Sequence, residues 1–296
     1  MYDVQRVYQA ESVREALSIL AQDGDALVVN GGTDVMIRLK ERKLKQASLV
    51  SIAGVQALKG ICVCENGDIR IGAGACFDDI YRNEDINARI PALAYACNQV
   101  GSPQIRHVAT IGGNICNGAV SADSVPVLLT LDAKLEIESQ SGCKITPLTG
   151  FHLAPGKVAL DKSAEILKAI VIPAAAYTDY ASAYIKFGQR SAMEIATLSC
   201  AANIRLAEDR QTVADVRIAF GVAAPTPVRC YKTESALKGR KLDAAFFSLL
   251  KRSALDELYP RESWRASKEL RVQLIRELSV RAVRRAAEIA GGEVYA

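Results

Sequence analysis

Two short glycine segments are the residues of this chain best suited to hold an anionic ligand. One spans residues 30–34, with the sequence Asn-Gly-Gly-Thr-Asp, and the other spans residues 110–114, Thr-Ile-Gly-Gly-Asn. Glycine reaches positive φ without a Cβ clash and leaves its amide hydrogen uncovered. Consecutive amides in such a turn bind anions, and the threonine hydroxyls and asparagine amides add donors. Together the two segments predict one ligand with a diphosphate in its middle.

Each glycine segment, taken alone, also fits an ordinary tight turn, since paired glycines disfavour both helix and strand. Neither segment is a Walker loop, because no Gly-Lys-Ser/Thr follows, and neither has the G-x-G-x-x-G spacing. Each carries a threonine beside the glycines and follows apolar residues. That shared pattern indicates dinucleotide binding, with two unrelated structural turns as the alternative.

Two charged residues are candidates for the same site. Asp123 would repel a phosphate, so it is better suited to accept hydrogen bonds from ribityl or ribose hydroxyls. It could equally be the N-cap of a helix that begins at Ser124. Lys186 lies in an apolar run, where it could place a cation near the negative charge of a reduced flavin or extend from a strand to solvent. Glu194 is expected to pair with Arg190 and not to act as a base.

The composition indicates a globular protein of two or three domains. The chain has 296 residues, half of them hydrophobic, and a mean hydropathy of +0.09. A net charge of +4 is small for this length and disfavours nucleic acid as a partner. An arginine-rich segment near the C-terminus is the one place where nucleic acid could bind, but glutamates interrupt it and no aromatic residues alternate with it.

Metal binding and membrane insertion are both disfavoured. The chain has two histidines and eight scattered cysteines without a C-x-x-C pair, so we expect buried, reduced thiols and no metal ligands. No stretch is long and apolar enough to span a bilayer, and residues 1–6 lack the apolar core of a signal peptide. These features predict a cytoplasmic protein.

The elements around the first glycine segment predict a βαβ unit. Residues 11–20 have helical periodicity, with Ser12 as N-cap and Glu15 completing a capping box. Residues 26–29 and 48–52 read as short strands, with a helix over 35–40 between them. Gly31 and Gly32 would then lie at the carboxyl end of a parallel strand, where ligands commonly bind.

The rest of the chain predicts antiparallel strands and helices. Residues 61–73 alternate around Asn66 and Gly67, which is the pattern of a β-hairpin. Helices are expected from Pro91 and from Ser124, and strands over 134–138 and 165–172, the latter ended by Pro173. Residues 181–187, 195–204 and 213–220 alternate as three antiparallel strands, followed by helices to the C-terminus.

These motifs together resemble the FAD-binding medium subunit of molybdenum hydroxylases, a flavoprotein family that includes xanthine, carbon monoxide and nicotinate dehydrogenases. The resemblance rests on residues 29–34, 109–115, 123–126 and 186–196 and extends over essentially the whole chain. Residues 219–230 and 263–269 look most like bacterial xanthine dehydrogenase FAD-binding subunits.

The resemblance implies an α+β fold in two domains. A two-lobed FAD-binding domain would span residues 1–175, with a small βαβ lobe over about 1–55 and a larger mixed or antiparallel lobe over 56–175. A C-terminal α+β domain with an antiparallel sheet and helices would span residues 176–296.

The resemblance also implies which residues contact FAD, held without a covalent bond. Residues 27–34 and 109–114 would hold the diphosphate and adenosine side, and Ile195 would approach the flavin ring. No residue is assigned as catalytic and none as a metal ligand. The expected cofactor contacts are Leu27, Val28, Val29, Asn30, Gly31, Gly32, Thr33, Asp34, Val100, Ala109, Thr110, Ile111, Gly112, Gly113, Asn114, Asp123, Leu167, Lys186 and Ile195.

The implied function is electron transfer in a heteromeric oxidoreductase complex acting on a purine or related N-heterocycle. Electrons would leave a molybdopterin-binding large subunit, cross 2Fe-2S clusters on a small subunit, reach FAD on this chain and pass to NAD+ or another acceptor. Two alternatives stay open. One is a stand-alone NADPH-dependent flavoprotein reductase of the same fold, for which no substrate residues are evident. The other is a basic, non-enzymatic scaffold that binds nucleic acid through its C-terminal helices.

Overall fold

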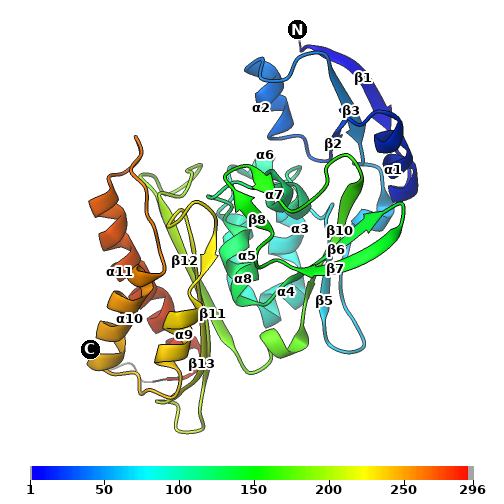
Figure 1. The fold of residues 1–296 in the computed structure, drawn as a ribbon. Coiled ribbons are helices and arrows are strands. Elements are labelled where there is room, and N and C mark those ends of the chain that lie inside the picture. The colour runs from blue at the N-terminus through cyan, green and yellow to red at the C-terminus, as the bar shows by residue number, and fades with distance from the viewer. Residues whose placement is uncertain (1, 293–296) are drawn as a thin grey trace.

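A computed structural model describes residues 2–292, and these residues form three packed parts (Figure 1). A small lobe lies at one end, a four-stranded sheet with its helices lies at the other, and a larger lobe lies between them. Strands and helices are combined in each part, and the predicted α+β fold class is confirmed. Within the described residues, no helix has the length and apolar character needed to cross a membrane.

The small lobe is a three-stranded parallel sheet in the order β1-β3-β2. Its elements are β1 (Val4–Gln9), α1 (Val13–Gln22), β2 (Leu27–Val29), α2 (Val35–Lys40) and β3 (Ala47–Ser51). Ser12 caps α1 by accepting a hydrogen bond of 3.1 Å from the Glu15 amide, as predicted. The predicted βαβ unit is confirmed, and Asn30 follows the carboxyl end of β2.

The larger lobe places helices against a five-stranded antiparallel sheet in the order β4-β5-β10-β6-β7. Gly67 has φ of +83° in the predicted hairpin turn, which is a left-handed conformation that glycine tolerates. The elements of this lobe are η1 (Gln56–Leu58), β4 (Ile61–Val63), β5 (Ile69–Gly72), α3 (Phe77–Arg82), α4 (Glu84–Arg89), α5 (Pro91–Asn98), α6 (Pro103–Arg106), α7 (Ile111–Asn117), α8 (Ser124–Thr130), β6 (Lys134–Ser139), β7 (Gly142–Pro147), β8 (His152–Ala154), β9 (Lys157–Val158), β10 (Glu165–Ile172) and η2 (Ala174–Ala176).

The second glycine segment is helical, which corrects the expectation that its glycines would keep it from forming a helix. Thr110 is the N-cap of α7, and its hydroxyl accepts a hydrogen bond of 3.2 Å from the Gly113 amide. Glycine costs helix stability, but Gly112 has a packing reason to be there. A Cβ on Gly112 would lie 2.6 Å from the Ala73 Cβ, so only glycine lets α7 approach the end of β5 this closely.

The C-terminal part is a four-stranded antiparallel sheet in the order β11-β12-β13-β14, which confirms the three predicted strands. Helix α11 packs on one face of the sheet, while α5 and α8 of the larger lobe pack on the other. Its elements are β11 (Ala181–Phe187), β12 (Leu198–Leu206), β13 (Val213–Gly221), β14 (Val228–Arg229), α9 (Tyr231–Leu237), α10 (Ala244–Asp256) and α11 (Lys268–Ile289).

Helix α8 is fully buried and is tied to the C-terminal sheet at its carboxyl end. The Thr130 carbonyl oxygen accepts hydrogen bonds of 3.3 Å from Asn203 and from Arg217. Arg229 donates to the Leu129 carbonyl at 3.2 Å. These donors satisfy helix carbonyls that would otherwise lack partners inside the protein. The larger lobe and the C-terminal sheet therefore share one buried helix.

Candidate functional site

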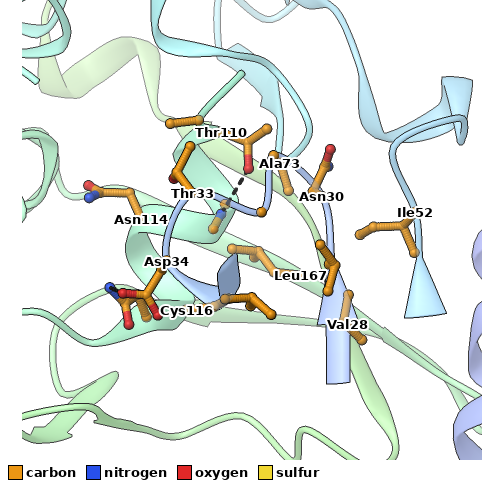
Figure 2. Close-up of a pocket in the computed structure, with 18 of the residues that line it drawn as sticks. Val28, Asn30, Thr33, Asp34, Ile52, Ala73, Thr110, Asn114, Cys116 and Leu167 are labelled. Carbon is orange, nitrogen blue, oxygen red and sulfur yellow. Dashed lines mark hydrogen bonds between the residues drawn. The ribbon is translucent and has the colours of Figure 1, made fainter. Parts of the chain in front are cut away.

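A cleft lies between the small and larger lobes, at the carboxyl ends of β2 and β3. Figure 2 shows the polar side chains of Thr33, Asp34 and Asn114 on one side of it, with Val28 and Ile52 on the other. The predicted site residues that line the cleft are Leu27, Val28, Val29, Asn30, Gly31, Gly32, Thr33, Asp34, Val100, Ala109, Thr110, Gly112, Gly113, Asn114 and Leu167.

The two glycine segments adjoin one another, although they are far apart in the sequence. A Cβ on Gly31 would lie 1.8 Å from the carbonyl oxygen of Val108, which is two residues before Thr110. No side chain fits at that distance, so glycine is needed for the two backbones to meet. Both segments therefore face the same cleft from different lobes.

The first glycine segment supplies a set of free amide hydrogens. Within residues 2–292, the amides of residues 30–35 have no hydrogen-bond acceptor. Gly32 has φ of +69°, a left-handed conformation that favours glycine. Consecutive unpaired amides beside a cleft form a partial positive charge that suits the oxygen atoms of a phosphate. This segment therefore has the anion-binding character that the sequence predicted.

The second glycine segment lacks that character, and the expectation of uncovered amides there is wrong. The amides of Ile111 and Gly112 donate to the carbonyl oxygens of Ala75 and Ala73, at 3.1 and 2.9 Å. The Gly113 amide donates a hydrogen bond to the Thr110 hydroxyl, and the Asn114 amide donates to the Thr110 carbonyl oxygen. Helix α7 instead contributes side chains to the cleft wall.

Side chains of α7 form hydrogen bonds with the first glycine segment and with α8. Asn117 donates a hydrogen bond of 3.3 Å to Asp34, which joins α7 to the first glycine segment. The Asn114 side-chain oxygen accepts a hydrogen bond of 2.8 Å from the Ser124 hydroxyl, while the side-chain NH2 group has no hydrogen-bond partner among the described residues. Asn114 can therefore still donate into the cleft.

The cleft has apolar walls beside its polar segment. Val28 and Ile52 come from the small lobe, whereas Phe77 and Leu167 come from the larger lobe. Cys116 also faces the cleft, and burial raises the pKa of its thiol to about 12. That thiol is therefore protonated at neutral pH and acts as a packing surface and not as a nucleophile. Flat apolar groups can lie against these walls while an anionic group meets the amides.

Sequence reasoning missed several residues of the cleft. Arg38 lies on α2, four residues after Asp34, so helical spacing places it on the same side as the glycine segment. Lys162 lies between β9 and β10, and no local pattern could have indicated it. The other missed residues are Ala26, Val35, Ile52, Ala73, Phe77, Ile105, Cys116, Asn117, Leu160, Glu165 and Ile166.

Asp123 and Lys186 form a buried ion pair that does not line the cleft. The Lys186 ammonium lies 2.8 Å from one Asp123 carboxylate oxygen, and the two side chains are only 8% and 7% exposed. The Tyr184 hydroxyl donates to the other oxygen at 2.6 Å. Burial raises the pKa of Asp123, and the Lys186 charge opposes that rise. Lys186 also donates a hydrogen bond of 2.9 Å to the carbonyl oxygen of Gln99. The next residue in the chain, Val100, lines the cleft.

The remaining predicted residues occupy other positions. Asp123 is at the N-cap position of α8, but its side chain makes no capping hydrogen bond. Ile111 lies in the core of the larger lobe, and Ile195 is 49% exposed in the loop before β12. Glu194 pairs with Arg190 at 2.8 Å, as expected. The roles toward a cofactor of Ile111, Asp123, Lys186 and Ile195 stay predictions.

The fold and the cleft define a dinucleotide-binding protein with a separate C-terminal domain, and comparisons with known families specify it further. Residues 2–175 match the family described as "FAD binding domain in molybdopterin dehydrogenase". Residues 183–286 match the family described as "CO dehydrogenase flavoprotein C-terminal domain". The chain belongs to the family of FAD-binding subunits of molybdenum hydroxylases and is an oxidoreductase subunit.

Individual relatives match over nearly their whole length. The xanthine dehydrogenase FAD-binding subunit of Escherichia coli O157:H7 is 40% identical, over 99% of this chain and 100% of that protein. The carbon monoxide dehydrogenase medium chain of Hydrogenophaga pseudoflava is 29% identical, over 92% and 93%. A solved structure of carbon monoxide dehydrogenase from that organism superposes with a TM-score of 0.92 at 27% identity, covering 98% and 99% of the two chains.

The residues of the cleft fit FAD. Its diphosphate needs donors and positive charge, which the amides of residues 30–35 supply. Its ring systems need apolar walls, which Val28, Ile52 and Leu167 supply. The close approach of Gly31 to Val108 is what brings these parts together. The predicted cofactor class is thus supported by the geometry and by the family.

Proposed function

We propose that this chain is the electron-transfer subunit of a multi-subunit molybdenum hydroxylase of the xanthine dehydrogenase type. The observation that carries the proposal is the cleft with free amides at residues 30–35, in a chain that matches this family over almost its full length. In this proposal FAD is bound without a covalent bond. When bound, FAD would take up electrons singly from one-electron carriers and could release them as a pair.

The electron path is the second part of the proposal. Electrons arrive from a molybdopterin-binding large subunit through 2Fe-2S clusters on a small subunit, and leave this chain to NAD+ or another acceptor. The chain's own residues bind and orient the cofactor and keep water from it. A purine or related N-heterocycle would be the substrate at the large subunit. A cytoplasmic location is part of this proposal.

We also propose the residue roles and domain limits implied by the family. The cleft residues of the two glycine segments hold the diphosphate and adenosine side, while Lys186 and Ile195 act near the flavin. Domain limits of 1–175 and 176–296 are supported by the sheets, because every sheet lies wholly on one side of residue 175.

The purified protein is expected to be yellow, with about one FAD per chain at saturation. Acid or heat denaturation should release the flavin into the supernatant, where chromatography identifies it as FAD. Apoprotein reconstituted with FAD, FMN or riboflavin provides the comparison. A colourless protein that takes up no FAD on reconstitution, or flavin that stays with the precipitate, would contradict the proposal.

A tagged chain expressed in its native host is expected to bring down two further polypeptides together with molybdenum and iron. Metal analysis and mass spectrometry of the purified complex measure this directly.

The two alternative functions predict different results. A stand-alone reductase would turn over NADPH as an isolated chain. A nucleic-acid scaffold would be colourless, and its binding to DNA would fall steeply with salt.

A further inference from the structure

Two positively charged side chains face the cleft from opposite lobes. Arg38 belongs to α2 of the small lobe, and Lys162 belongs to the connection between β9 and β10 of the larger lobe. Among the residues that the structure describes, neither has an ion-pair or side-chain hydrogen-bond partner. Cations of a folded protein that line a cleft without counter-ions are suited to bind an anion.

The two carboxylates at the same cleft have different partners. Asp34 accepts a hydrogen bond from Asn117 at 3.3 Å. Glu165 pairs with Lys144 and also accepts from the Asp161 amide at 3.0 Å. Asn117 is neutral, so Asp34 keeps its negative charge, and among the described charged residues that line the cleft two unpaired cations remain beside one unpaired carboxylate. The two cations lie in the same cleft as the free amides of residues 30–35, which add partial positive charge.

We infer that Arg38 and Lys162 are the counter-charges of the FAD diphosphate, one from each lobe; this rests on the proposed function. A diphosphate diester carries one negative charge on each phosphate, so two cations neutralise it. Because the cations belong to different lobes, the diphosphate ties the small lobe to the larger one. The pair also selects ligands with a diphosphate over riboflavin, which has no phosphate. Arg38 and Lys162 are thus binding and specificity residues.

The test compares FAD affinity of the apoprotein by fluorescence titration in Arg38→Gln, Lys162→Gln and the double variant. Each single change is expected to weaken FAD binding about tenfold, equivalent to about 1.4 kcal/mol. The double change is expected to weaken it about a hundredfold if the two contributions add. Because screening acts on these charges, raising NaCl from about 0.05 to about 0.5 M should weaken FAD binding in the wild type far more than in the double variant. Riboflavin affinity should stay unchanged in all variants.

Matched controls come from the same elements. Lys40→Gln changes an exposed cation of α2 that does not line the cleft, and Lys157→Gln does the same on β9. Both should bind FAD like the wild type, and Arg38→Lys should recover most of the affinity. Wild-type affinity in the double variant, or an equal loss for riboflavin, would overturn the inference. If the wild-type apoprotein itself takes up no FAD, the proposed function fails instead.

Discussion

Gly31→Ala is expected to abolish retention of FAD during purification while leaving most of the protein folded. The new Cβ would lie 1.8 Å from the Val108 carbonyl oxygen and 2.6 Å from its carbonyl carbon. The obstacle is backbone, so it cannot rotate away as a side chain would. The first glycine segment must therefore separate from Val108, and its free amides move away from the cleft. We expect FAD affinity to fall by at least about a hundredfold, which corresponds to about 2.7 kcal/mol.

The stability of Gly31→Ala should fall less than its affinity for FAD. Overpacking of this kind costs about 1–3 kcal/mol of unfolding free energy, and the segment is at the edge of the small lobe and not in a core. Urea unfolding of the apoprotein measures this cost, and the flavin absorbance per chain measures retention.

A matched control is Gly24→Ala, in the turn before the same strand β2. A Cβ there meets nothing within 4 Å, and Gly24 does not have a left-handed φ. That variant should keep its FAD and its stability. If Gly31→Ala carries as much FAD as Gly24→Ala, the contact between the two glycine segments is not needed for binding.

The glycine segments correctly predicted where the cleft lies, but the predicted role of the glycines holds for only one of the two segments. The sequence pattern predicts that the glycines leave room for a phosphate, whereas in the structure Gly31 and Gly112 leave room for other parts of the chain. Gly31 admits Val108, and Gly112 admits Ala73. Such contacts depend on segments distant in sequence, so no local pattern reveals which atom fills the space beside a glycine.

Elements with strong local patterns were predicted correctly. The hairpin turn at Gly67, the capped helix α1 and strands β11 to β13 follow from turn residues, caps and alternation within the segments themselves. Helix α7 was not predicted, since its glycines disfavour a helix in isolation. Packing against Ala73 and capping by Thr110 outweigh that propensity.

Local sequence patterns also predict only some of the charged residues of the site. Arg38 follows Asp34 by one helical turn, so the predicted helix already placed it near the glycine segment. Lys162 reaches the cleft only through the fold of the larger lobe. Asp123 and Lys186 were both singled out as ligand contacts, but their ion pair forms across 63 residues and could not be read from either one.

Lys186→Met is expected to destabilise the protein by about 3–5 kcal/mol, because it leaves the Asp123 carboxylate buried without its counter-ion. The groups that face Asp123 include Lys186 and Tyr184 on β11, and Cys97 on α5 lies close enough for its thiol to feel the carboxylate charge. Of these, only Lys186 carries a positive charge. Urea unfolding of the apoprotein at neutral pH measures the loss.

The loss should depend on pH with a definite sign. Burial raises the pKa of Asp123 in the folded state, and Lys186 opposes that rise. A carboxyl group with a raised folded-state pKa stabilises the fold below the ordinary aspartate pKa, and this stability is lost as the pH rises through the folded-state value. In the Lys186→Met variant, the Lys186 charge no longer opposes the rise in the pKa of Asp123. The stability of Lys186→Met should therefore fall more steeply than that of the wild type as the pH rises above the ordinary aspartate pKa of about 4.

Two further variants separate charge burial from simple loss of a side chain. Lys168→Met breaks another strand lysine–carboxylate pair, with Glu138, but both side chains there are 30% exposed and the cost should be below about 1 kcal/mol. Adding Asp123→Asn to Lys186→Met removes the stranded charge while keeping an acceptor for Tyr184. That double variant should regain most of the stability and lose the added pH dependence. If it is as unstable as Lys186→Met at every pH, the stability loss does not come from the buried, unpaired charge of Asp123.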